Sequence, residues 1–232
     1  HGTAYANRAI VECDLMMAVG ARLDDRILGV PSHFCKNAVK IHIDIDGAEF
    51  GKLVKPDIRC RGDAKTVLQD LLPLVKRADT SEWVSRLAGY KKKWPLTFSR
   101  KGGLHPPQII SALSDLTGGK AIMTTDVGQH QMWAWQFFKC DKPWQFITSG
   151  GAGTMGFGLP SAIGAQFGRP GETVLCIAGD GGFQMTMSEL ATAGIHKLPI
   201  KIIIMNNHYL GMVRQWQDMF YDERYSGVDL EG

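Results

Sequence analysis

The chain has 232 residues, which is enough for one or two domains with a sizeable buried core. Hydrophobic residues make up 44% and charged residues 21%, a globular composition that excludes collagen-like, low-complexity and disulfide-rich scaffolds. The 26 basic and 23 acidic residues leave a net charge of +3 at pH 7, an excess too small to predict a nucleic-acid-binding surface.

The cysteines and the apolar runs indicate the redox compartment and whether the chain spans a membrane. The five cysteines contain no CxxC pair, so we interpret them as free thiols in a reducing compartment. No apolar run approaches the roughly 20 residues that cross a bilayer, so we expect no membrane span. The chain begins with His1 and ends soon after a predicted helix, and we therefore expect a fragment of a longer protein.

The first 78 residues alternate between helix and strand patterns. Helical spacing of apolar residues predicts helices at 5–12 and 64–75, the second interrupted by Pro73. An apolar run at 14–20 and an alternating run at 39–46 predict strands. This alternation predicts a parallel sheet in an α/β domain that covers residues 1–78.

Residues 79–105 contain no strand candidate, and we expect a linker there. Trp83, Leu87, Tyr90 and Trp94 fall on one side of a predicted amphipathic helix, which a glycine-containing connection follows. The lysines at 91–93 are interpreted as a solvated face.

Residues 106–232 resume the alternation and predict a second open α/β domain, truncated at its carboxyl end. Strands are expected at 121–125, 146–148, 173–178 and 200–205, and helices at 106–116, 156–167, 186–195 and from 211 onward. Thr186 and Glu189 have the spacing of a capping box, which predicts a helix start at Thr186.

Residues 151–156 read GAGTMG and match the GxGxxG pattern of dinucleotide-binding loops. That pattern requires an acidic residue about 20 positions later, at the end of the next strand. The next strand ends in Ala178 and Gly179 instead, so the pattern alone does not predict a nicotinamide site.

Two predicted strands end in oxygen-bearing side chains. Asp180 stands among glycines after the strand at 173–178, and Asn206 and Asn207 follow the strand at 200–205. Parallel strands bring their carboxyl ends to one edge, and carboxylate and amide oxygens suit magnesium. Taken separately, each segment is better interpreted as ordinary structure, the first as a strand-to-helix turn and the second as a polar strand end.

Together, the GDGG at 179–182 and the NN at 206–207 resemble the signature of thiamine-diphosphate-dependent enzymes. Within that superfamily, further motifs resemble the catalytic subunit of acetolactate synthase. These motifs are 20–26 (GARLDDR), 127–134 (VGQHQMWA), 148–160 (TSGGAGTMGFGLP) and 211–216 (GMVRQW). The implied fold is part of a central FAD-binding parallel-sheet domain, followed by most of a thiamine-diphosphate-binding parallel-sheet domain.

The resemblance implies a magnesium and thiamine diphosphate site in the second domain. The implied metal ligands are Asp180, Asn207 and the backbone carbonyl of Tyr209. The implied thiamine-diphosphate-binding residues are Gly128, Gln129, His130, Gly153, Met155, Gly179, Gly181 and Gly182. Met155 would meet the aminopyrimidine ring, although a methionine at such a position can also be core.

The resemblance further implies that Met212 and Trp216 line the substrate pocket, and core packing is the alternative for Trp216. In the first domain it implies FAD, held by Gly20, Arg22, Asp24, Arg26, Asp44, Ile45, Glu49 and Asp63. Guanidinium groups and strand-end carboxylates suit diphosphate and ribose. Without the resemblance, the charges at 22–26 would be interpreted as a surface ion-pair cluster.

Two positions depart from the family pattern. The family commonly has serine at the place of Gly182, which leaves only a backbone amide for the diphosphate here and predicts weaker cofactor binding. Trp135 occupies a place where a small residue is usual.

No residue can be assigned as the glutamate that activates the cofactor, which the family carries in an amino-terminal domain. The chain alone is therefore expected to be inactive.

The implied activity is decarboxylation of pyruvate and its carboligation to a second 2-keto acid, in branched-chain amino-acid biosynthesis. Alternatives are a pyruvate oxidase or glyoxylate carboligase type of enzyme, or a non-catalytic nucleotide-binding module. The implied partners are a second copy in a homodimer or homotetramer and a small regulatory subunit, with neither nucleic acid nor membrane. The implied location is the cytoplasm of a bacterium, or a plastid or mitochondrion in a eukaryote.

Overall fold

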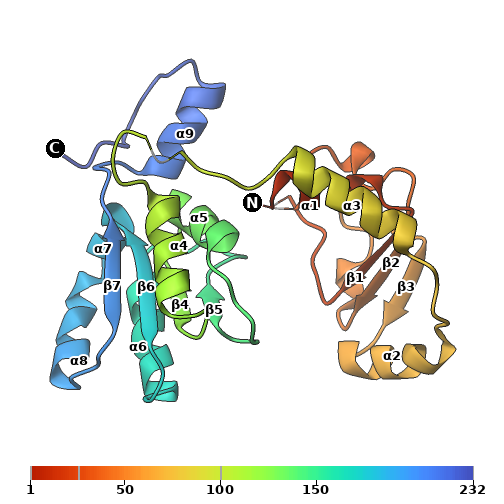
Figure 1. Ribbon diagram of the computed structural model, residues 1–232, viewed down its shortest axis with the longest axis horizontal. Helices are drawn as coiled ribbons and strands as arrows, with labels where there is room; N and C mark the ends of the chain where they lie inside the picture. The colour runs from red at the N-terminus through yellow and green to blue at the C-terminus, as the bar shows by residue number, and fades with distance from the viewer. Residues whose placement is uncertain (1, 26, 100, 232) are drawn as a thin grey trace. The chain divides into compact units, whose positions relative to one another are not determined.

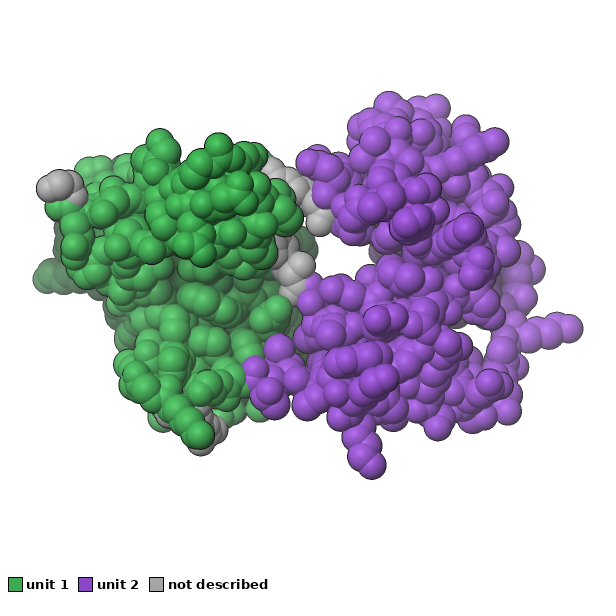
Figure 2. Space-filling view, turned by 90° about the horizontal axis from the view of Figure 1, so that it is seen from above, with its two compact units in different colours: residues 1, 98–232 green, residues 2–97 purple. Residues whose placement is uncertain are grey.

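The computed structural model describes residues 2–25, 27–99 and 101–231, and the chain forms two compact units. Unit 2 comprises Gly2–Thr97, and unit 1 runs from Phe98 to the carboxyl end (Figures 1 and 2). Each unit contains its own parallel sheet, which confirms the expected α/β class.

Unit 2 is built on a three-stranded parallel sheet in the order β1-β2-β3. Its strands are β1 (Leu15–Val19), β2 (Val39–Asp44) and β3 (Ile58–Arg61), and its helices are α1 (Ala4–Glu12), α2 (Ala64–Leu71) and α3 (Ser81–Lys93). Short 3-10 turns lie at η1 (Pro31–His33), η2 (Gly47–Glu49) and η3 (Leu72–Leu74). Ala18, Leu23, Leu28 and Val54 form a small buried cluster on one face of the sheet.

Helix α3 belongs to unit 2 because it packs on α1. Arg86 on α3 donates to the Glu12 carboxylate at the end of α1 at 2.7 Å, and the Tyr90 hydroxyl donates to the same carboxylate. The predicted helix within residues 79–105 is therefore present, but it is part of a folded unit, and the boundary between the units follows Thr97.

Two expectations for unit 2 need correction. The short strand β3 was not predicted, because Arg59 and Arg61 alternate with only two apolar residues and give it little hydrophobic signal. The helix predicted at 64–75 ends as an α-helix at Leu71, since Pro73 cannot donate the next helical hydrogen bond and the chain continues as η3.

Unit 1 is built on a four-stranded parallel sheet in the order β5-β4-β6-β7 (Figure 1). Its strands are β4 (Ile122–Thr125), β5 (Phe146–Thr148), β6 (Val174–Gly179) and β7 (Lys201–Met205). Its helices are α4 (Pro106–Leu116), α5 (Gln129–Phe137), α6 (Gly158–Gly168), α7 (Asp180–Thr186), α8 (Leu190–Ile195) and α9 (Gly211–Phe220), with a 3-10 turn η4 (Met187–Glu189).

Strand β6 is buried at every position because both faces of the sheet are covered. Leu175 and Ile177 point to the side of α4 and α5, where they pack with Ile110 and Met123. The alternate residues of β6 pack against α6 on the other side. That second cluster comprises Ile122, Ala162, Val174, Cys176 and Ala178. The core of unit 1 thus fixes β4 and β6 side by side.

The predicted capping box at Thr186 is wrong. Helix α7 begins at Asp180 and ends at Thr186, whose hydroxyl donates to the carbonyl of Gly156 at 3.0 Å instead of accepting from a helical amide. Helix α5 was not predicted either, because its aromatic and glutamine residues show little amphipathic pattern. None of the helices in the described residues is long and apolar enough to cross a membrane.

Candidate functional site

A cleft lies where the strand order of unit 1 reverses. The chain passes from β4 outward to β5 and then returns across β4 to β6, so the loops after β4 and β6 diverge at the carboxyl edge of the sheet. Residues after β4, β6 and β7, together with Met155, line the cleft. They are Val127–His130, Trp133, Met155, Gly179–Gly182, Met205, Asn207 and Tyr209–Val213.

Asp180 and Asn207 line this cleft together, as their strand-end positions predict. Strands β6 and β7 are neighbours, with Gly179 opposite Met205, so the residues that follow them lie at one edge. The N–H of His208 donates to Asp180 Oδ2 at 2.8 Å, and the N–H of Tyr209 donates to Asn207 Oδ1 at 3.1 Å. These bonds order the loop and leave further oxygen lone pairs for a cation.

The loop after β7 is held on its other side as well. Tyr209 forms an isolated antiparallel bridge with Asp229, and the Arg214 guanidinium lies 4.0 Å from the centre of the Tyr209 ring. The same guanidinium lies 4.5 Å from the Tyr225 ring. This stacking holds the Tyr209 side chain, and the bridge to Asp229 holds its backbone, in the loop that lines the cleft.

His130 is the buried titratable group of the cleft. Its Nε2 atom is buried and has no hydrogen-bond partner among the described residues. Burial lowers the pKa of His130 to about 4, against the smaller opposing effects of Asp126 and Asp180. The imidazole is therefore neutral at pH 7 and leaves a buried, unpartnered polar atom that a polar group of a ligand could satisfy.

Glycines let the backbone approach His130 and the loop after β7. A Cβ atom at Gly128 or Gly179 would lie 2.9 or 3.0 Å from the His130 ring. Gly128 also has a φ of 153°, which disfavours any side chain. At Gly211 a Cβ would lie 2.4 Å from Gln129 Oε1 and 2.7 Å from Asn207 Nδ2. The glycines therefore leave a narrow polar cradle rather than a flexible loop.

Asp126, which the sequence reading missed, organises the loops around the cleft. Its buried carboxylate accepts from the N–H groups of Val127, Gly156 and Gly158, at 2.7, 3.0 and 3.1 Å. It thereby ties the end of β4 to the loop that carries Met155. The sequence does carry a signal for this role, because a charged residue stands directly after a buried strand, next to Val127 and Gly128.

Gly182 faces Asp126. A Cβ atom at Gly182 would lie 2.4 Å from Asp126 Oδ1, so the glycine is required by the packing of this carboxylate. Trp135, the second departure, stacks on Phe146 with ring centres 6.2 Å apart and fills space beside Gly150.

Only some of the other residues proposed for this site line the cleft. Met155 and Met212 line the cleft, whereas Gly153 and Trp216 are absent from its lining. Gly153 has a φ of 65° in the loop before α6. Trp216 is 55% exposed and contacts Phe220 on α9, so core packing does not describe it.

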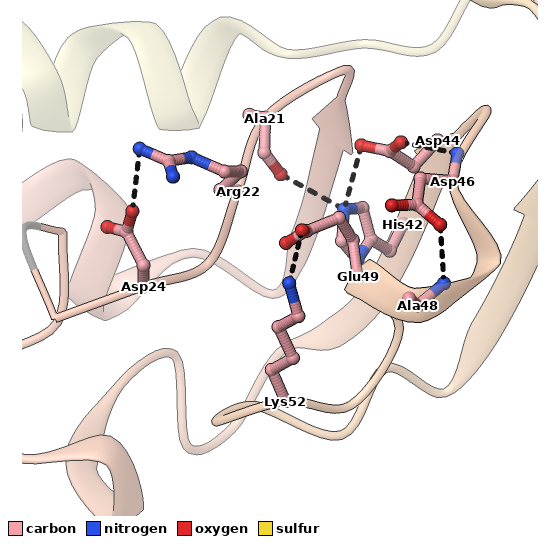
Figure 3. A network of polar contacts seen from close by, with 9 residues as sticks. All are labelled: Ala21, Arg22, Asp24, His42, Asp44, Asp46, Ala48, Glu49 and Lys52. Atoms are coloured by element: carbon pink, nitrogen blue, oxygen red, sulfur yellow. Dashed lines mark hydrogen bonds and ion pairs between the residues drawn. The ribbon is translucent and has the colours of Figure 1, made fainter. Parts of the chain in front are cut away.

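The candidate FAD residues of unit 2 follow β1 and β2 (Figure 3). Arg22 pairs with Asp24 at 3.2 Å in the loop after β1, and Glu49 pairs with Lys52 beyond β2. The carboxylate of Asp44, at the end of β2, is buried and accepts from the N–H of Asp46 at 2.9 Å.

The remaining candidates of unit 2 differ in role. Gly20 has a φ of 59° and donates its N–H to Ile43 at 2.8 Å, which closes the turn after β1. Ile45 is exposed, and Asp63 caps α2 by accepting from the N–H of Thr66 at 3.0 Å. Arg26 lies outside the described residues.

Comparison with known families accounts for most of the chain. Residues 126–232 match the family described as "Thiamine pyrophosphate enzyme, C-terminal TPP binding domain", and residues 1–71 match "Thiamine pyrophosphate enzyme, central domain". The chain belongs to the thiamine pyrophosphate enzyme family. The C-terminal match starts at Asp126 and includes every residue that lines the cleft, and the central-domain match covers the β1-β2-β3 sheet.

Within the thiamine pyrophosphate enzyme family, the chain is homologous to acetolactate synthase large subunits. It is 48% identical to the one from Lactococcus lactis over 97% of the chain, and 49% identical to the one from Porphyra purpurea over 97%. It is 49% identical over 95% to the chloroplastic acetolactate synthase 2 of Nicotiana tabacum. The chain spans 34–40% of the length of these relatives.

Proposed function

We propose that the chain forms the cofactor-binding part of an acetolactate synthase, which decarboxylates pyruvate and joins it to pyruvate or 2-ketobutyrate. One observation carries the proposal. The cleft at the strand-order reversal brings together Asp180, Asn207 and Tyr209, a glycine-lined cradle and the unpartnered Nε2 of His130. This arrangement fits a magnesium-bound diphosphate.

The oxygens of Asp180, Asn207 and the Tyr209 backbone would hold Mg²⁺. No group of three or more His, Cys, Asp or Glu residues suited to a metal occurs among the described residues, so one carboxylate is combined here with amide and carbonyl oxygens. Such a set of hard oxygens suits Mg²⁺, which completes its octahedron with water and phosphate oxygens.

The N–H groups of Gly181 and Gly182, at the start of α7, would face the diphosphate together with Gly128, Gln129, His130 and Gly179. Thiamine diphosphate, when bound, supplies the electron sink for loss of carbon dioxide and for carboligation. Neutral His130 would line this cradle and offer its unpartnered Nε2 to a polar group of the ligand.

On the substrate side, Met155 and Gly153 would meet the aminopyrimidine, and Met212 would form an apolar wall of the substrate pocket. Trp216, one helical turn after Met212 on α9, would extend that wall toward the second keto acid. The residues that line the cleft include no glutamate. We assign the activating carboxylate to a domain of the partner subunit.

Unit 2 would hold FAD at the ends of β1 and β2. The buried Asp44 carboxylate has the position of a ribose-binding acid, and Arg22 and Asp24 lie in the loop where the diphosphate would pass. Gly20, Arg26, Ile45, Glu49 and Asp63 complete the proposed set. Here FAD would be held without net redox chemistry.

We further infer an assembly of two or four copies, with a small regulatory subunit as an additional partner. The relatives include a bacterial and a chloroplastic protein. We favour the cytoplasm as the location.

The metal assignment is tested by calorimetric titration of thiamine diphosphate into the complete gene product, with Mg²⁺ or with chelator. Asp180→Asn keeps an oxygen that can accept from His208 but removes the charge, so we expect at least tenfold weaker Mg²⁺-dependent binding. The matched control is Asp115→Asn, an exposed carboxylate paired only with Lys139 among the described residues.

Equal binding by Asp180→Asn and wild type would refute the metal site. The activity is tested separately, by identifying the product that the complete enzyme forms from pyruvate. Acetolactate supports the proposal, whereas the products of a pyruvate oxidase or a glyoxylate carboligase, or no turnover with cofactors bound, contradict it.

A further inference from the structure

His42 connects the two strand ends of unit 2 from within the core. It is the fourth residue of β2 and is 1% exposed, on the sheet face that carries Ala18. Its Nε2 lies 3.0 Å from the carbonyl oxygen of Ala21, in the loop after β1, and 3.8 Å from Asp44 Oδ2, at the end of β2 (Figure 3). A single imidazole thus reaches both loops.

The geometry fixes the proton of this imidazole. A carbonyl oxygen only accepts, so Nε2 must carry the hydrogen that it donates to Ala21. The Asp44 oxygen at 3.8 Å is too distant to accept it as well. Asp44 is held instead by the N–H of Asp46 on Oδ1. Its Oδ2 accepts no hydrogen bond from the described residues and remains for a ligand.

The ring is also held from a third side. Phe50, directly after η2, meets the His42 ring edge-on, with ring centres 5.1 Å apart and planes at 90°. The loop after β1, the end of β2 and the segment after Glu49 therefore all contact one side chain.

This imidazole is an unusual choice for a core position. Its Nδ1 is buried without a partner among the described residues, and an unsatisfied buried polar atom costs stability. An aliphatic residue would avoid that cost but would leave the Ala21 carbonyl without its donor. The hydrogen bond to the loop after β1 is thus what the histidine adds over an apolar side chain.

We propose that His42 is a positioning residue that sets the spacing between Arg22 and Asp44, and so determines the affinity of unit 2 for a flavin dinucleotide. This inference rests on the FAD site proposed above. A dinucleotide that spans the two strand ends requires its diphosphate and ribose partners at a fixed separation. Ala21 immediately precedes Arg22. The hydrogen bond from His42 to the Ala21 carbonyl therefore ties the loop that carries Arg22 to strand β2, which ends at Asp44.

The test compares His42→Gln, His42→Asn and His42→Leu in the complete gene product stripped of flavin. The amide nitrogen of glutamine can reach the position of Nε2, whereas that of asparagine reaches only the position of Nδ1. The readouts are the dissociation constant for FAD, followed by flavin fluorescence, and the urea midpoint of the apoprotein. Phe50→Leu is the control that disturbs the same core but keeps the hydrogen bond.

We expect His42→Asn and His42→Leu to bind FAD at least tenfold more weakly, and His42→Gln and Phe50→Leu to stay within about threefold of wild type. Equal FAD affinity in all variants overturns the role of His42 while the FAD site stands. Loss of affinity that merely follows the urea midpoint, Phe50→Leu included, also overturns it. Absence of FAD binding in wild type refutes the proposed site itself. If His42→Leu fails to fold, the glutamine and asparagine variants still decide.

Discussion

Burial determines the protonation of His130, and this has a consequence for stability. The pKa of His130 is lowered from its usual 6.5 to about 4 in the folded protein. Between these values the unfolded chain binds a proton that the folded chain does not, so stability is complete above pH 6.5 and falls as the pH drops toward 4.

We expect this one group to remove roughly 3 kcal/mol of stability across that window. Urea unfolding of wild type and His130→Gln at several pH values from 7 to 4 measures it. The glutamine variant should lose less stability on acidification, while the exposed control His33→Gln should follow wild type. Parallel pH profiles for all three proteins would contradict the assignment.

Gly182 illustrates how a departure from a family pattern is explained by its neighbour. Here a serine Cβ would lie 2.4 Å from Asp126 Oδ1, an oxygen already held by backbone amides. We therefore predict that Gly182→Ser destabilises the protein by about 1–3 kcal/mol and gains no affinity for thiamine diphosphate.

Urea unfolding and calorimetry of Gly182→Ser measure the two effects. Gly171→Ser is the control, because a Cβ there meets open space. Tighter cofactor binding by Gly182→Ser at unchanged stability would show that the serine pattern of the family is accommodated here, and that the glycine does weaken binding.

At the scale of elements, Thr186, the last residue of α7, holds the loop before α6. The Thr186 hydroxyl donates to the carbonyl of Gly156, next to Met155 of the cleft. We expect Thr186→Val to cost about 1 kcal/mol and to weaken thiamine diphosphate binding, since the loop loses its donor. Thr192→Val on α8 is the control.

The variant Thr186→Asp distinguishes this tie from a helix cap. Aspartate is a good N-cap residue but has no hydrogen to donate to Gly156 when ionised. It should therefore destabilise the protein more than valine does, as measured by thermal unfolding. Preserved stability in Thr186→Asp would restore the capping role that the sequence alone predicts.

Some elements and contacts could be predicted from the sequence and others could not, for a physical reason. Helix α4 occurs at the residues that its apolar spacing predicts, and the buried run of β6 gives an equally direct signal. Asp180 and Asn207 could be brought together from sequence because adjacent parallel strands bring their ends to one edge. By contrast, the roles of Asp126 and Thr186 depend on backbone groups about 30 residues away, and local pattern does not encode those contacts.

At the scale of the whole molecule, exposed apolar side chains predict association. On one face of the unit 2 sheet, Leu15 is 52% and Val39 47% exposed, and they lie opposite each other in neighbouring strands. Met17 and Ile58 continue the same face and are also exposed. Contiguous apolar patches of this kind mark interaction surfaces or aggregation sites.

We therefore expect the 232-residue chain to self-associate at micromolar concentration in light scattering and sedimentation velocity. The double variant Leu15→Gln/Val39→Thr should shift the population toward monomer, because it removes apolar area from the centre of this face while keeping strand-compatible side chains. Leu116→Gln, a single exposed leucine at the end of α4, should not. A monomeric wild type would show that this face stays exposed to solvent. If the double variant associates as strongly as wild type, the chains associate through another surface.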